Sequence, residues 1–171
     1  MNHSTTARMA AAAVFATAIL SAPTASAAPP SGPADIFYEL DAGLGCSFPL
    51  TVSGTDSKRH TKEFLDENGL TVRIIEAGKG FNLTYTNETT LQSIYFAGNG
   101  SVTQTRIDTE TNISTVTATG NNGLILFPTD IPEGPTAVQY VGRIVYTVDA
   151  AGIFTLQSTS GTSVDICAAL D

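Results

Sequence analysis

The sequence has few of the residues on which most catalytic sites depend. It contains two histidines and no tryptophan. One histidine, His3, lies at the amino terminus, and the other, His60, lies in the basic run SKRHTK at 57–62. A Ser-His-Asp triad needs a histidine as its base, and no serine of this chain stands in a Gly-x-Ser-x-Gly motif. We therefore expect no catalytic residue of this class, and we expect His60 to lie on the surface.

Metal ligands and positive charges are scarce as well. A zinc site needs three or four His, Cys or carboxylate ligands, and the sequence offers only two histidines and two cysteines besides its acids. Eight Lys and Arg face sixteen Asp and Glu, so the net charge is -8. Contacts to phosphate backbones and to anionic lipid depend on lysine and arginine. We predict no cofactor and no nucleic-acid partner, and we identify no metal site.

Calcium is the one metal that the sequence leaves open. Asp108, Glu110 and Asn112 place oxygen ligands at alternate positions, which is how oxygen-rich loops begin to surround this ion. The glycine and the distal bidentate glutamate of an EF-hand are missing. Acids with threonines are also ordinary residues of hairpin turns, so a turn is the competing interpretation.

The amino terminus has the pattern of an export signal. Arg8 precedes an apolar, alanine-rich run over 9–20, and the small residues at 25–27 suit a signal peptidase. An apolar run of about a dozen residues is too short to be a stable membrane anchor. Loss of Arg8 with the signal would bring the net charge to about -9. We predict a secreted protein with a signal peptide over 1–27, a flexible segment over 28–35 and a single all-β domain over 36–171.

Two cysteines lie near the opposite ends of the predicted domain. In an exported chain, a lone pair such as Cys46 and Cys167 indicates one structural disulfide. A reactive pair or a metal site would need partners that the sequence lacks. We predict that the bond joins the first strand of the domain to the last.

Apolar residues alternate with polar residues in several segments, which is the pattern of β-strands with one buried face. Such series occupy 48–52 and 81–85, and the longest covers 138–148, with Gly142 as a bend or bulge. The segment at 58–66 is also predicted to be a strand, because it lacks the full apolar stripe of a helix.

Turn residues recur at intervals of roughly ten positions, which is typical of antiparallel hairpins. They occur at 68–69, 78–80, 87–88, 98–100, 109–112, 121–122, 150–152 and 160–161. We expect an all-β fold of about nine or ten strands. A hairpin-rich, antiparallel β-sandwich is our first prediction, and a closed meander β-barrel is the alternative, since both architectures manage exposed sheet edges.

The stretch from 117 to 135 is the richest in turn residues. The sequence TGNNG at 119–123 predicts a tight hairpin that reverses the chain, because asparagine and glycine tolerate positive φ. The apolar run at 124–127 predicts a strand covered on both faces. The following segment, 128–135, predicts a stiff surface crossover. Its candidate interaction residues are Pro128, Thr129, Asp130, Pro132, Glu133 and Pro135.

Several fragments, taken in order, are similar to one group of proteins. They are the APP stretch at 28–30, CSFPL at 46–50, TKEFL at 61–65, LTYTN at 83–87, TGNNGLILF at 119–127 and DICAAL at 165–170. On these residues the chain resembles small secreted actinobacterial proteins of uncharacterised function. The resemblance implies an exported all-β domain with one terminal cysteine pair, and it implies no active site.

The leading hypothesis for function is an exported, non-enzymatic domain that binds a protein or cell-envelope component through exposed loops. A lipocalin-like carrier of a small apolar ligand is an alternative. Its cavity would be lined by Phe81, Leu83, Tyr85, Tyr140, Ile144 and Tyr146. A carboxylate-dependent hydrolase would need two acids across a cleft, and a protease inhibitor would use the 128–135 segment. The ligand, the partner and the oligomeric state stay open.

Overall fold

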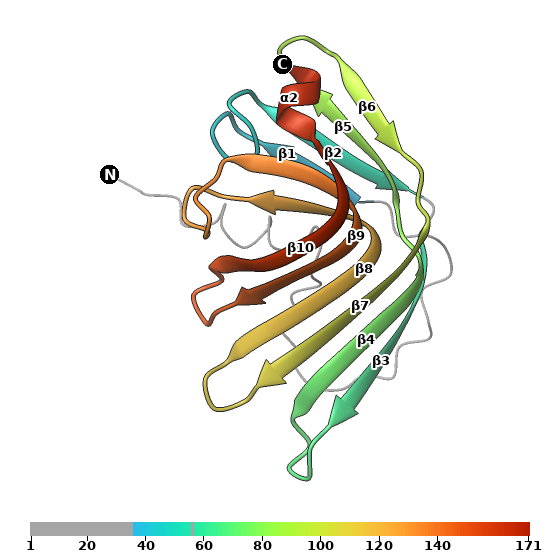
Figure 1. The fold of residues 1–171 in the computed structure, drawn as a ribbon, viewed down its shortest axis with the longest axis vertical. Helices are drawn as coiled ribbons and strands as arrows, with labels where there is room; N and C mark the ends of the chain where they lie inside the picture. The colour runs from blue at the N-terminus through green and yellow to red at the C-terminus, as the bar shows by residue number, and fades with distance from the viewer. Residues whose placement is uncertain (1–35, 56) are drawn as a thin grey trace.

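The computed structural model describes residues 36–55 and 57–171, which form ten β-strands and one short helix (Figure 1). The strands make two antiparallel sheets, and neither sheet closes on itself within these residues. The all-β sandwich with about nine or ten strands is therefore confirmed over the closed barrel. The predicted signal peptide and flexible segment lie outside the described residues. No helix in the described part of the chain is long and apolar enough to cross a membrane.

The smaller sheet has four strands in the spatial order β1-β2-β5-β6. They are β1 (Ile36–Leu40), β2 (Leu50–Thr55), β5 (Asn82–Asn87) and β6 (Ser93–Phe96). The larger sheet has six strands in the order β10-β9-β8-β7-β4-β3. They are β3 (Lys58–Leu65), β4 (Thr71–Lys79), β7 (Gly100–Asp108), β8 (Ile113–Leu126), β9 (Thr136–Val148) and β10 (Phe154–Asp165). The strands predicted at 58–66 and 138–148 are confirmed as β3 and β9.

Four glycines with positive φ, Gly78, Gly120, Gly142 and Gly161, bend the larger sheet along one line, which we call the glycine line. Gly161 pairs with Gly142, and Gly142 pairs with Gly120. Gly120 pairs with Ser101, which pairs in turn with Gly78. The φ angles at these glycines lie between +99° and +152°, a region that other residues rarely adopt. A β-carbon on any of the four would lie 2.3 Å or less from a backbone oxygen of the neighbouring strand. The sheet therefore curves strongly along the line (Figure 1).

The hairpin turn predicted at 119–123 is wrong, and so is the turn predicted at 160–161. Both segments run through the middle of long strands, β8 and β10. Tight turns and sharply bent strands both need positive φ, and glycine provides it in either setting. The pattern predicts the conformation of Gly120 but not where the chain goes next. The bend at Gly142 is confirmed, and pairing with β8 continues through it without a register shift.

The larger sheet contributes to an apolar core on each of its faces. Leu124 and Leu126 share one cluster with Val116, which lies on the other side of the bend. This face is therefore concave, and we call it the inner face and its opposite the outer face. Ile125, with the opposite orientation, belongs to the cluster shared with the smaller sheet and with α2. The strand predicted to be covered on both faces is confirmed for these residues of β8, whereas Phe127 is only partly buried.

The predicted disulfide between Cys46 and Cys167 is present, with the two Cα atoms 5.4 Å apart. The predicted join between the first strand and the last is wrong. Cys46 lies in the loop between β1 and β2, and Cys167 lies in helix α2 (Ile166–Leu170). Asp165 caps this helix by accepting the backbone N–H of Ala168 at 3.0 Å. Because Cys46 is fully buried in the core between the sheets, the bond fixes the carboxyl-terminal helix to that core.

A chain of side-chain hydrogen bonds crosses between the two sheets. The Tyr85 hydroxyl of β5 donates to the Gln139 side chain of β9 at 3.0 Å, and Gln139 donates to Asn121 of β8 at 2.5 Å. Asn121 then donates to the backbone carbonyl of Ala97 at 3.0 Å. Tyr85 and Gln139 are both buried, and burial raises the pKa of Tyr85 above its usual value. Asn121 thus satisfies a buried amide where the sequence indicated a turn residue.

Candidate functional site

The loop between β8 and β9, residues 127–135, is anchored by a buried acid. Asp130 is 4% exposed. One of its carboxyl oxygens accepts the N–H of Phe127 at 2.6 Å, and the other accepts the N–H of Phe154 at 2.9 Å. The backbone N–H groups of Asp130 and Gly134 both donate to the Phe127 carbonyl, at 2.9 and 3.0 Å. Asp130 therefore belongs to the support of the β8–β9 loop, and its carboxyl group is not presented to a partner.

The β8–β9 loop also pairs with the start of β10. The N–H of Ile131 donates to the Phe154 carbonyl at 2.8 Å, and the N–H of Leu156 donates to the Ile131 carbonyl at 2.7 Å. The Ile131 side chain nevertheless stays 57% exposed. Pro128, Thr129, Pro132 and Glu133 are exposed as well, and Pro135 is half-buried. The β8–β9 loop therefore has a fixed backbone, and it exposes the apolar side chain of Ile131 to solvent.

The interaction residues predicted from the sequence include Asp130 but not Ile131. An acid in a proline-rich segment resembles a solvent-exposed loop residue, and a single isoleucine resembles a core residue. The hydrogen bonds that reverse this assignment come from β10, which is remote in sequence. Local composition carries no signal of that contact.

The anchoring role of Asp130 predicts a measurable cost on substitution. Asp130→Asn should lower the free energy of unfolding by about 1 to 3 kcal/mol, because one of the two N–H groups would then face an amide NH2 instead of an oxygen. Glu133→Gln, in the same loop but exposed, is the matched control and should change it by no more than about 0.5 kcal/mol. Chemical denaturation of both variants measures this. Equal stability of the two would contradict the anchor.

The residues considered for calcium form the turn between β7 and β8. The Asp108 carboxylate accepts the backbone N–H of Glu110 at 2.9 Å and of Thr111 at 3.2 Å. These bonds, with that from Thr111 the larger, lower the pKa of Asp108. Asn112 has φ +54° and completes the reversal. The turn accounts for all these residues, and no group of three or more His, Cys, Asp or Glu that could hold a metal occurs in the parts of the chain that the structure describes.

The aromatic and aliphatic residues proposed for a carrier cavity do not come together. Leu83 and Tyr85 belong to the core between the sheets, whereas Ile144 and Tyr146 belong to the inner-face cluster. The larger sheet separates the two sets. An open depression of about 270 Å³, which we call the bend depression, lies instead at the glycine line and is lined by Gly78, Gly100, Ser101, Val102, Thr119 and Gly120. It is smaller than most pockets that enclose a small molecule.

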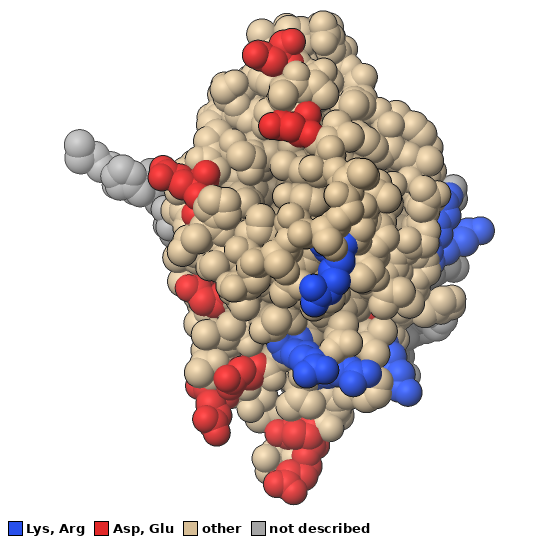
Figure 2. All heavy atoms as spheres, in the orientation of Figure 1, with Lys and Arg blue, Asp and Glu red and all other residues tan. Residues whose placement is uncertain are grey.

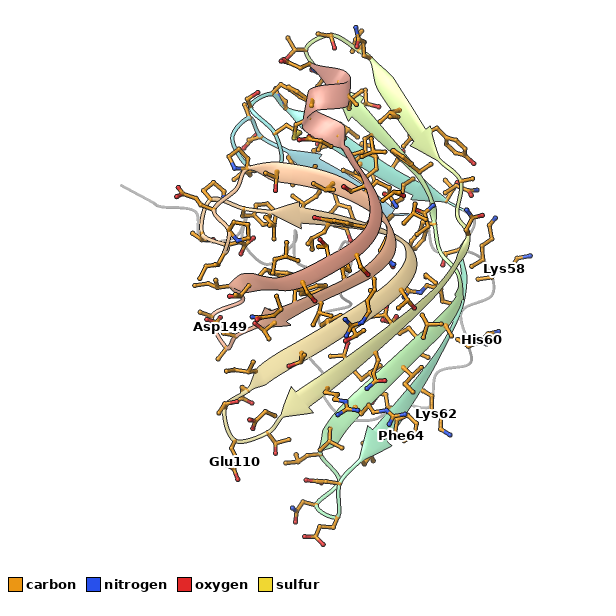
Figure 3. The ribbon with its side chains drawn as sticks, in the orientation of Figure 1. Lys58, His60, Lys62, Phe64, Glu110 and Asp149 are labelled. Carbon is orange, nitrogen blue, oxygen red and sulfur yellow. A yellow bond between two sulfur atoms is a disulfide. The ribbon has the colours of Figure 1, made fainter. Side chains whose placement is uncertain are left out.

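His60 is exposed on β3, which confirms its predicted surface position (Figure 3). Lys62 and Phe64 follow it at intervals of two residues, so the three side chains share one face of the sheet. No family model, no curated protein and no solved structure matches this chain.

Proposed function

We propose that the chain is an exported, non-enzymatic domain that binds a protein or cell-envelope component through the β8–β9 loop. The observation that carries this proposal is the pair of hydrogen bonds to Asp130, which fixes the loop while Ile131 stays 57% exposed. A loop that is already ordered loses less conformational entropy on binding than a flexible one. An exposed apolar side chain between prolines can then insert into a partner's pocket at low cost.

Export is supported by features that are independent of the loop. The first residues have the composition of a signal peptide. The Cys46–Cys167 disulfide is of the kind that persists in oxidising compartments. The resemblance to secreted actinobacterial proteins, carried by the fragments described above, implies the same location.

Site-specific photo-crosslinking in the secreting organism tests the function. A photoreactive residue replaces Ile131 in one protein and Leu70, which is 52% exposed in the β3–β4 turn, in a control. We expect one crosslinked partner at position 131 that is absent at position 70. The purified partner should then bind Ile131→Asp about tenfold or more weakly than it binds the unmodified protein or Leu70→Asp. Equal binding by the two variants, or no crosslink at 131, would reject the loop as the binding site.

A further inference from the structure

The outer face of the larger sheet gathers basic side chains, although the whole chain carries a net charge of -8. Arg73 of β4 pairs directly with Arg106 of β7, and Phe64 of β3 pairs with Arg73. Lys62 lies two residues from Phe64 and so on the same face. Val102 lies four residues from Arg106 on β7, so both are on this face, and Val102 pairs directly with Thr119 of β8. Thr119 pairs in turn with Arg143 of β9, which therefore lies on the same face. We call Lys62, Arg73, Arg106 and Arg143 the basic row. Figure 2 shows basic side chains over this part of the molecule and acidic ones toward its margins.

An aromatic ring holds the basic row at the β3 edge. The Lys62 amino group lies 5.0 Å from the centre of the Phe64 ring, and the Arg73 guanidinium lies 4.5 Å from it. Both contacts are within the range of cation–π attraction. The Nε of Arg73 is buried and has no hydrogen-bond partner. The guanidinium is thus positioned by the ring while part of its hydrogen-bonding capacity stays unused.

The acidic groups that the structure describes do not form ion pairs with the basic row. Within the described residues, no carboxylate lies within ion-pairing distance of Lys62, Arg73, Arg106 or Arg143. Glu63 and Glu76 lie on the opposite face of the sheet, and the acids at the end of the sheet are held in the hairpin turns. Asp66 accepts the N–H groups of Asn68 and Leu70, Asp108 accepts those of Glu110 and Thr111, and Asp149 accepts those of Ala151 and Ile153. Figure 3 shows Glu110 and Asp149 at these turns, away from Lys62.

Neutral hydrogen-bonding groups lie between Arg106 and Arg143. Gln104 lies on β7 two residues from Arg106, and Thr115, Thr117 and Thr119 follow one another on the same face of β8. From Lys62 on β3 to Arg143 on β9 the row crosses four strand spacings, roughly 19 Å. The bend depression, lined by Val102 and Thr119, opens beside Arg143's pairing position. The surface is thus long and open, with Lys62, Arg73 and Arg106 grouped at the β3 side, Arg143 on β9, and threonine hydroxyl groups on β8 between the two.

We propose that the basic row and the threonines beside it, on the part of the outer face that the smaller sheet leaves uncovered, bind a linear polysaccharide that carries carboxylate groups. Arginine side chains can hold carboxylates through paired N–H donors, while the threonines and Gln104 can exchange hydrogen bonds with sugar hydroxyls. A sugar ring can occupy the shallow bend depression. Nucleic acid fits less well, because a duplex carries one charge per about 1.7 Å and the excess negative charge of the chain opposes such a dense polyanion. This site is separate from the β8–β9 loop and does not depend on the function proposed for it.

Titration of the oxidised protein with polygalacturonate tests the site, with dextran as the uncharged polymer. We expect binding to polygalacturonate that weakens as salt is raised, and none to dextran. The double variant Arg106→Gln/Arg143→Gln should bind about tenfold or more weakly. Both arginines are exposed, so the thermal midpoint should stay the same and a loss of binding would not reflect unfolding.

The double variant Thr89→Glu/Gln92→Glu is the matched control, since it lowers the net charge equally at exposed positions of the β5–β6 turn. It should retain affinity within about twofold, because its added charges lie on the smaller sheet, away from the basic row, and are screened. If both double variants bound polygalacturonate equally weakly, the loss of affinity would be an effect of net charge alone, and the proposed site would be overturned. Tighter binding to polyglutamate or to single-stranded DNA would overturn the polysaccharide assignment, and no binding to polygalacturonate would reject it outright.

Discussion

Gly142→Ala is expected to lower the free energy of unfolding by about 2 to 6 kcal/mol, because two penalties act at one position. The backbone has φ +152°, where a side chain adds strain of about 1 to 3 kcal/mol. The new β-carbon would also lie 2.0 Å from the backbone oxygen of Ser160 in β10. Relieving this overlap requires the strands to separate, which costs about 1 to 3 kcal/mol more. Chemical denaturation with an unchanged slope measures the loss.

Gly152→Ala separates the two penalties. Gly152 has φ +80°, and a β-carbon there would meet nothing within 4 Å. This control should therefore show the backbone strain alone, about 1 to 2 kcal/mol. If Gly142→Ala and Gly152→Ala cost the same, close packing along the glycine line contributes nothing to the fold.

Removing the disulfide is expected to have an effect of similar size. Cys46 and Cys167 are separated by 121 positions, and opening a loop of that length returns about 4 to 5 kcal/mol of chain entropy to the unfolded state. Alanine is the suitable replacement at both positions, because Cys46 is fully buried among apolar side chains and serine would bury a hydroxyl there. The double variant should therefore unfold at a markedly lower denaturant concentration.

Reduction of the unmodified protein provides the matched comparison, and it should shift the unfolding midpoint by nearly the same amount. Mass analysis after alkylation identifies the bond itself. We expect no alkylation without reductant and two alkylated cysteines with it. Two modified thiols in the unreduced secreted protein would show that the bond does not form.

The elements predicted well from the sequence are those that local pattern determines. Strand β9 follows from alternation over 138–148, and the buried segment of β8 follows from the apolar run that contains Ile125. The disulfide follows from export and from a lone cysteine pair. In each case, the residues that form the predictive pattern are the same residues that form the element.

The elements predicted badly depend on partners that are distant in the sequence. Gly120 predicts positive φ, but its pairing with Gly142 decides that the strand continues. Tyr85 and Tyr146 have the same alternating pattern, yet they face different cores, because one bent sheet has apolar side chains on both faces. The basic row depends on pairing such as Arg73 with Arg106, which no local spacing predicts.

The glycine line makes the curvature of the sheet a collective property. Each glycine lies against a backbone oxygen of the next strand, so one strand cannot straighten unless its neighbours straighten with it. The bend angle of the sheet is therefore set along the whole glycine line and not in each strand separately. Val116 and Leu124, on opposite sides of the bend, share one cluster, and the bend angle sets the distance between them. A change at Gly161 in the edge strand should thus loosen packing in β8, two strands away, at side chains that it never touches.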